Sequence, residues 1–324
     1  MTNRHGLRIM LAVVLLGANP PGAPAQQYPS KPIRIVNGFA PGGPSDVGAR
    51  TIAQKLTETW GQQVIVDTRP GAGGNIAAEM VAKSPADGYT LLLGVFAHAV
   101  NASLYAKLPF DPIKDFAPII LFASVANVLV VHPSLPVQSV KQLIALAKTQ
   151  PGQLSCGSAG NGTASHLALE LMNLIAGTRI NHIPYKGLAP AHTDVVGGQI
   201  TMLFDGIVTA MPHAKIGRLR MLAVTTAKRW QGAAEVPTMA EAGLPGYEVN
   251  SWYGLLAPAG TPRDIIQRLN TEVARGLRAP DARDRLYTIG AEPMADTPEA
   301  FAAYIDAEAA KWAKVVKAAG IRVD

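Results

Sequence analysis

Two segments rich in glycine and hydroxyl side chains are the strongest candidates for chemistry in this sequence. The first segment, Phe39 to Asp46, reads FAPGGPSD, and the second segment, Gly157 to His166, reads GSAGNGTASH. Each follows a short apolar run typical of a strand and precedes a pattern typical of a helix. Glycine allows close backbone approach, and the free N–H groups of a helix start attract an anion. Together they predict a carboxylate gripped from both sides of a cleft, although either segment alone is better explained as a capped glycine-rich turn.

Motifs of enzymes and cofactor sites are missing from the sequence. CGSAG around Ser158 lacks the first glycine of a G-x-S-x-G nucleophile elbow. GAGGNI after Pro70 lacks the final glycine of a dinucleotide fingerprint, and no G-x4-G-K-[ST] occurs. The 7 histidines include no H-E-x-x-H pattern, and the single cysteine, Cys156, cannot form an internal disulfide or a thiolate cluster. We therefore expect no enzymatic activity, no cofactor and no metal site.

Composition bounds the class of protein. The chain has 324 residues, 48% of them hydrophobic and 16% charged, with a formal net charge of +6. This length favours about two domains, because a single core rarely grows larger. Lysine and arginine are scattered singly among acidic residues, without a basic run interleaved with aromatic side chains. Nucleic-acid binding is therefore not expected.

The N-terminus has the layout of a secretory signal peptide over residues 1–25. Arg4 and Arg8 precede the apolar run Ile9 to Leu16, and Ala23-Pro24-Ala25 supplies a small-x-small cleavage site. A buried N-terminal helix would leave the intervening prolines unexplained. No later stretch approaches the ~20 apolar residues of a membrane helix. We expect a mature protein without a transmembrane segment, located in the periplasm.

Short apolar strands alternate with amphipathic helices along the rest of the chain. We expect strands at 33–36, 64–66, 91–93, 129–131, 180–183, 201–204 and 221–224, and helices at 45–60, 139–147, 165–176, 262–277 and 298–319. Thr261 and Thr297 are expected to cap the last two helices, and Gly177 and Gly320 to end theirs. Continuous apolar strands, including a buried one at 64–66, predict an α/β fold with mainly parallel sheets flanked by helices.

Several motifs, in order, resemble the Bug/TctC-like solute-binding receptors of tripartite tricarboxylate transporters. They are YPSKPIRIV and PGGPSD between Tyr28 and Asp46, RPGAGGNIAA from Arg69, ADGYTLLLG from Ala86, GSAGNGTASHLALEL from Gly157, IPYKG from Ile183, FDG from Phe204, EVPTMAEAGLPGYE from Glu235 and GLLAPAGTP from Gly254. The resemblance implies a two-lobed periplasmic-binding-protein fold (Venus-flytrap, type II-like) that closes on a small carboxylate. We expect residues 26–124 and 249–324 in one lobe and 125–248 in the other.

The resemblance also implies which residues contact the ligand. They are Phe39, Ala40, Gly43, Ser45, Asp46, Phe96, Ala97, His98, Ser158, Ala159, Asn161, Gly162, Thr163, His166 and Asp205. From the residues themselves, His166 is better explained by packing at a helix start, Asp205 equally by a helix cap, and Phe96 equally by inward packing. Relatives usually carry smaller hydroxyl residues around Phe96 and an aromatic residue in place of Cys156. The phenyl ring of Phe96 at the expected ligand site favours a ligand with one carboxylate and an apolar or aromatic remainder.

The implied role is delivery of the carboxylate to the membrane permease subunits of such a transporter, by a protein expected to be a monomer. Two alternatives remain. A ligand-sensing subunit that signals to a two-component kinase would have the same binding fold. A secreted α/β hydrolase is less consistent with the sequence, because it would need a nucleophile and base that no motif supplies.

Overall fold

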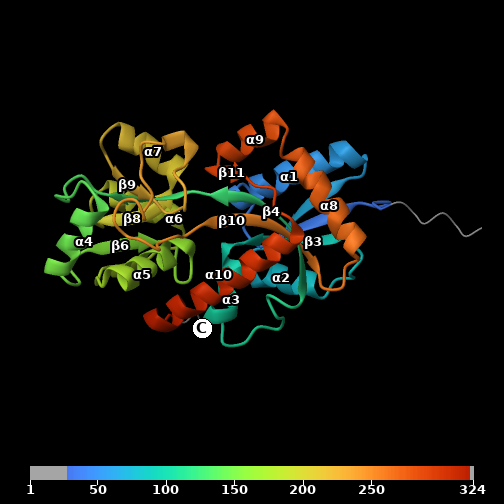
Figure 1. Ribbon diagram of the computed structural model, residues 1–324, viewed down its shortest axis with the longest axis horizontal. Coiled ribbons are helices and arrows are strands. Elements are labelled where there is room, and N and C mark those ends of the chain that lie inside the picture. Colours follow the sequence, from blue (N-terminus) through green and yellow to red (C-terminus); the bar gives the residue numbers. More distant parts are fainter. Residues whose placement is uncertain (1–27, 322–324) are drawn as a thin grey trace, which may run out of the picture.

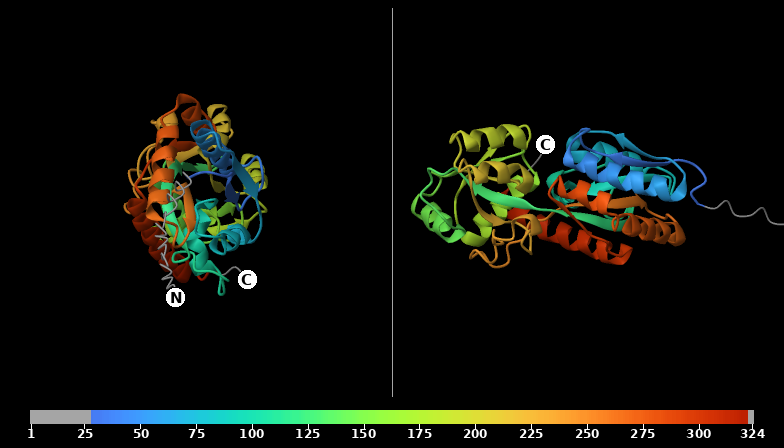
Figure 2. Two further views of the ribbon diagram at one scale, coloured as in Figure 1. Left: turned by 90° about the vertical axis from the view of Figure 1, so that its right-hand side faces the viewer. Right: turned by 90° about the horizontal axis from the view of Figure 1, so that it is seen from above.

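The structure is a computed structural model that describes residues 28–321. The expected signal peptide lies outside the described residues. Two β-sheets lie side by side along the long axis of the molecule, each flanked by helices (Figure 1). Views from the end and from above show the helices on both sides of each sheet (Figure 2). The expected α/β class is therefore confirmed.

The six-stranded sheet combines the two ends of the chain. In spatial order its strands are β11 (Ala291–Pro293), β4 (Phe116–Val125), β10 (Ser251–Pro258), β3 (Thr90–Val95), β1 (Ile33–Asn37) and β2 (Val64–Thr68). Its helices are α1 (Pro44–Trp60), α2 (Asn75–Ala82), α3 (Phe96–Leu104), α8 (Arg263–Gly276), α9 (Pro280–Tyr287) and α10 (Pro298–Ala319).

The five-stranded sheet is built from the middle of the chain. In spatial order its strands are β7 (Asn181–Pro184), β6 (Ser155–Ser158), β8 (Met202–Gly206), β5 (Asn127–Val131) and β9 (Arg220–Val224). Its helices are α4 (Val140–Thr149), α5 (Ala164–Ala176), α6 (Leu188–Val196) and α7 (Ile207–Lys215). The chain enters this sheet directly after β4 and returns to the other sheet in β10. The lobe boundaries expected from the sequence stay a prediction.

The sheets are mixed, which corrects the expectation of mainly parallel strands. β1 is parallel to β2 and β3, and β6 is parallel to β7 and β8. β10 is antiparallel to both of its neighbours, and so is β5. The reason is the passage between the sheets: β4 leads out and β10 leads back beside it, so the two must run in opposite directions.

Two local expectations were wrong. Strand β2 is an edge strand, half-exposed along its length, with Ile65 at 48% exposure. Thr261 does not cap α8, because its hydroxyl donates to Pro258 O (2.8 Å) and the helix begins at Arg263. By contrast, Thr297 Oγ1 accepts from Ala300 N (3.1 Å), as expected for a helix cap.

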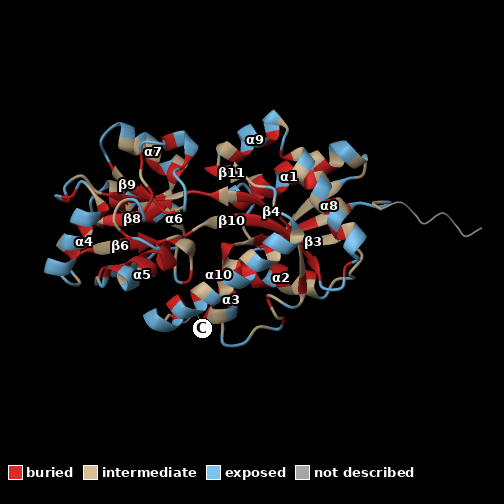
Figure 3. Cartoon of the chain, in the orientation of Figure 1, coloured by how far each residue is buried: buried red, intermediate tan, exposed pale blue. Residues whose placement is uncertain are grey.

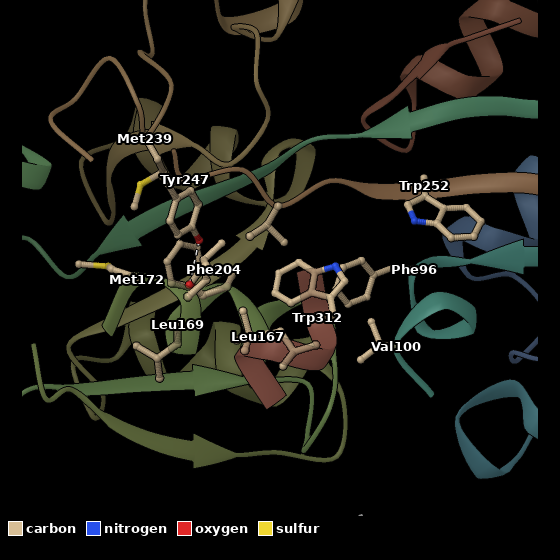
Figure 4. Close-up of a cluster of buried hydrophobic side chains, with 14 of the residues drawn as sticks. Phe96, Val100, Leu167, Leu169, Met172, Phe204, Met239, Tyr247, Trp252 and Trp312 are labelled. Carbon is tan, nitrogen blue, oxygen red and sulfur yellow. Dashed lines mark hydrogen bonds between the residues drawn. The ribbon is translucent and has the colours of Figure 1, made fainter. Parts of the chain in front are cut away.

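One core cluster joins the two sheets through α10. Buried side chains concentrate in the strands and on the inner faces of the helices (Figure 3). Helix α10 packs on α3 and α5, and its Trp312 is fully buried. The Trp312 ring meets Phe96 edge to face at 5.1 Å, and Leu167 lies near it (Figure 4). No helix within residues 28–321 combines the length and the apolar character that crossing a membrane requires.

Candidate functional site

Both segments singled out in the sequence line one pocket of about 330 Å³. Its wall consists of Phe39, Ala40, Gly43, Pro44 and Ser45 from the first segment, Val95, Phe96 and Ala97 around the start of α3, Thr163 and Ala164 from the second segment and α5, and Ser251, Trp252 and Tyr253 from β10. The two segments belong to different sheets, so the pocket lies where the sheets meet. Four aromatic rings make its wall mainly apolar.

The first segment presents a helix start to this pocket. Gly43 is the residue before α1, Pro44 is its first residue, and Ser45 lines the pocket. The first-turn amides of Ser45 and Asp46 have no intrahelical acceptor, which makes this end of the helix partly positive. A carboxylate beside Ser45 would therefore be bound by backbone N–H groups without an arginine.

Asp46 does not line the pocket, and one of its carboxylate oxygens is used within its own loop and helix, so its contact with a ligand stays a prediction. Its Oδ2 accepts from Gly42 N (3.0 Å) and from Arg50 Nε (2.8 Å), so the side chain closes the loop on itself. Burial by itself raises the pKa of Asp46, but the hydrogen bonds from Arg50 and Gly42 outweigh it and hold the pKa below its ordinary value. The Asp46 carboxylate therefore stabilises the conformation of the first segment. Asn37 Oδ1 stabilises the same segment by accepting from Phe39 N (3.2 Å).

The second segment uses three of its own amides in hydrogen bonds to its own side chains. Three of its N–H groups donate to side chains of the same segment: Ala159 to Ser165 Oγ (3.0 Å), Gly160 to Ser158 Oγ (3.0 Å) and Gly162 to His166 Nδ1 (3.1 Å). These amides cannot also bind a ligand in this conformation. From this segment, only Thr163 and Ala164 line the pocket, and Ala164 is the first residue of α5.

Several expected site residues therefore lie outside the pocket wall. Ser158 and His166 are buried within the second segment and do not line the pocket, and neither do Ala159, Asn161 and Gly162. His166 makes the packing contact at a helix start that the residue pattern favoured. Phe96 combines both interpretations, because it is buried against Trp312 and also lines the pocket.

Ser158 and His182 form a serine–histidine contact that the sequence spacing did not indicate. Ser158 Oγ lies 2.5 Å from His182 Nε2, because β6 and β7 pair in parallel with Cys156 opposite His182. Ser158 is fully buried, and its hydroxyl also contacts Gly160 N and Gly160 O. A nucleophile must reach its substrate, and this hydroxyl is enclosed by its own loop. Within residues 28–321, no three His, Cys, Asp or Glu side chains are grouped to hold a metal ion.

Asp205 is also held by a histidine, away from the pocket wall. It lies in β8 at 1% exposure, and its Oδ2 is 2.5 Å from His192 Nδ1. The hydrogen bond to Asp205 raises the pKa of His192. Asp205 Oδ1 accepts from Gly206 N (2.8 Å), and Gly206, not Asp205, is the residue that caps α7. The contact of Asp205 with a ligand stays a prediction.

His98 lies behind the pocket wall, where it packs edge to face on Phe116 at 4.8 Å. Burial lowers the pKa of His98 to about 4. The unfolded chain therefore takes up a proton below pH 6.5 while the folded protein does not, so acidification from pH 7 to pH 4 favours unfolding. We expect His98 alone to cost about 3 kcal/mol of stability over this range. Urea unfolding at several pH values should show a flatter pH dependence for His98→Gln, and parallel curves would contradict this.

Strand β10 contributes to the pocket wall, which the sequence pattern did not predict. Ser251, Trp252 and Tyr253 open this strand and reach the pocket beside Val95, because Tyr253 pairs with Val95 across the antiparallel contact with β3. The stretch SWYGLL resembles any apolar strand, and only its pairing with β3 places the rings at the pocket. Two adjacent aromatic residues at a strand start were the available signal.

Comparisons with known proteins agree on one family. The family model described as "Tripartite tricarboxylate transporter family receptor" matches residues 48–321. The chain is 39% identical over 315 residues to a UPF0065 protein from the tcbD-tcbE intergenic region of Pseudomonas sp. (strain P51), with 96% of this chain and 94% of that protein covered.

Two solved structures are similar over almost the whole chain. One is Rpa4515 of R. palustris with adipate, at 43% identity and a TM-score of 0.79, covering 91% of this chain and 100% of that one. The other is the periplasmic binding protein BugD, at 34% identity and a TM-score of 0.75, covering 91% of this chain and 100% of that one. The similarity in sequence and fold thus extends over both sheets.

Proposed function

The chain belongs to the tripartite tricarboxylate transporter receptor family, and we propose that it binds a small carboxylate in the pocket between its two segments. The observation that carries this proposal is the meeting of two helix starts, α1 and α5, from different sheets at one pocket. Both helix starts carry unpaired amides and the positive end of a helix dipole. A carboxylate between them would be held from both sides.

The middle of the pocket supports a ligand with an apolar body. Phe39, Phe96, Trp252 and Tyr253 face the space between the helix starts, and Ser45 and Thr163 are the hydroxyl residues beside them. A wall with so few polar side chains does little to compensate the desolvation of the additional carboxylate and hydroxyl groups that citrate carries. The related Rpa4515 structure contains adipate, whose two carboxylates flank four methylene groups. We propose an adipate-like or aromatic carboxylate rather than citrate.

In this proposal the protein is a periplasmic monomer that passes its ligand to membrane permease subunits and catalyses no reaction. The comparison with BugD supports the periplasmic location. The enclosed hydroxyl of Ser158 supports the absence of hydrolysis, because no substrate carbonyl can reach it in this arrangement. Transport rather than sensing is supported by the family. Uptake of the bound carboxylate by cells that carry permease subunits of such a transporter should stop when this chain is deleted.

Calorimetry on the mature protein tests the binding step. We expect adipate or benzoate to bind more tightly than malate and citrate. Tryptophan fluorescence should change at the same concentrations, because Trp252 lines the pocket and Trp312 touches Phe96. Phe96→Ser places a hydroxyl at this position and should reduce the difference in affinity between adipate and citrate. Tight citrate binding by the unmodified protein, with adipate and benzoate silent, would refute the proposed ligand class.

A further inference from the structure

A brace of two histidine rings spans the second segment. His166, in the first turn of α5, accepts from Gly162 N through Nδ1 (3.1 Å) near the end of the segment. His182, in β7, contacts Ser158 Oγ through Nε2 (2.5 Å) near its beginning. The two rings stack with their centroids 3.7 Å apart and their planes inclined by 10°. The two ends of the segment are therefore tied to one another through the ring pair.

We infer that His166 and His182 are positioning residues for ligand binding: the stacked ring pair holds the second segment in the conformation that presents Thr163 and Ala164 to the pocket. This inference rests on the proposed function, because the pocket must be the ligand site. The link is short. Gly162, whose amide His166 holds, directly precedes Thr163, and Thr163 directly precedes the first residue of α5. Gly162 has φ +74°, so this conformation suits glycine and little else.

The hydrogen bond from Gly162 assigns the tautomer of His166. Nδ1 of His166 accepts an N–H, so it carries no proton, and its Nε2 faces Glu170 Oε1 at 3.6 Å. Ser158 Oγ accepts from Gly160 N and lies within hydrogen-bond distance of both Gly160 O (3.2 Å) and His182 Nε2 (2.5 Å), so its proton can serve either acceptor. A proton on His166 Nδ1 would set two donors against each other at Gly162 N, whereas the Ser158 hydroxyl can donate to His182 Nε2 or accept from it.

The surroundings of His182 favour a neutral ring near pH 7. Burial, and then the neighbouring His166, lower the pKa of His182 to about 4. Glu170 is the carboxylate that faces the pair, from the same helix as His166. Cys156, opposite His182 on β6, stays an uncharged thiol because burial raises its pKa. His182 is thus neutral near pH 7, and as the pH falls toward 4 its protonation places a charge against the stacked His166 ring.

Matched substitutions separate this role from plain packing. His166→Asn keeps an acceptor near the position of Nδ1, and His182→Gln keeps one near the position of Nε2, whereas His166→Leu and His182→Leu remove them. We expect each Leu variant to bind adipate about tenfold more weakly, the loss that corresponds to one buried hydrogen bond. The amide variants should lose about threefold or less. His132→Leu, at a histidine that contacts Ser134, is the control.

Hydrogen–deuterium exchange of the ligand-free protein tests the brace without any ligand. Peptides over residues 157–166 should lose about tenfold protection in His166→Leu but keep it in His166→Asn and in the control. Adipate affinity of the unmodified protein should fall more steeply between pH 6.5 and 4 than that of His182→Gln, which has no ring to protonate. Leu and amide variants that behave alike in exchange would overturn the inference, as would loosened exchange with unchanged adipate affinity.

The two proposals fail in different ways. If the unmodified protein bound none of the carboxylates, the proposed function would fall, and the ring pair could no longer be said to serve binding. Hydrogen–deuterium exchange would still show whether the two histidine rings stabilise the conformation of the second segment. If adipate binds and only the Leu variants lose both exchange protection and affinity, both proposals stand.

Discussion

Replacing Ala97 with tryptophan should reduce carboxylate binding by about 100-fold or more while leaving the protein folded. Ala97 lies in the first turn of α3, half-buried, and its side chain lines the pocket of about 330 Å³. An indole there fills the space between the two helix starts, so a ligand cannot reach Ser45 and Thr163 together. Calorimetry with adipate measures the loss, and the thermal midpoint of unfolding reports whether the fold is kept.

Two matched variants make this result specific. Ala97→Ser adds a small hydroxyl at the same position and should keep adipate affinity within about threefold, because it removes no space of consequence. Ala318→Trp places the same indole on an exposed position of α10 and should leave binding unchanged. Adipate affinity of Ala97→Trp within threefold of the unmodified protein would place the ligand outside this pocket.

Local sequence patterns predicted the elements but not how the sheets are assembled. Apolar runs and glycine stops located most helices and strands, since these depend on neighbours in sequence. The family, predicted from ordered motifs, is confirmed by the match over residues 48–321. The antiparallel arrangement of β10 beside β3 and β4 depends on partners more than 100 residues away in sequence. No local pattern carries that information, so the mixed sheets were missed.

In the candidate site, too, some residues could be predicted from local sequence patterns and others could not. The pocket includes Gly43, Ser45 and Thr163, which the helix-start pattern indicated, and their contact with a ligand stays a prediction. Asp46 has the residue type of a ligand contact, and its Oδ2 accepts from Gly42 and Arg50, so its contact with a ligand also stays a prediction. Hydrogen-bonding side chains near a loop have both options, and only the fold decides between them. The Ser158–His182 contact likewise follows from the pairing of β6 with β7.

Replacing Gly254 with alanine should destabilise the protein by about 2–3 kcal/mol, the cost of forcing a methyl group into a packed core. Gly254 is buried in β10, two residues after Trp252. A Cβ at this position would lie 2.2 Å from Phe301 Cζ and 2.9 Å from Ile120 O. The ring could shift, but the carbonyl belongs to β4, the strand paired with β10, and cannot move without breaking the sheet. Urea unfolding followed by circular dichroism measures the loss.

The comparison with Gly206 isolates the steric cause of that loss. A Cβ on Gly206 would meet Thr209 Oγ1 at 3.5 Å, an ordinary contact, so Gly206→Ala should change stability by about 0.5 kcal/mol or less. Phe301→Leu should recover part of the lost stability when combined with Gly254→Ala, because it removes the ring but leaves Ile120 O in place.

The Gly254→Ala variant should also bind adipate more weakly. Phe301 packs edge to face on Trp252 at 5.5 Å, so a displaced Phe301 ring should disturb the pocket wall. Equal stability of the Gly254 and Gly206 variants would show that β10 is not tightly enclosed at this point.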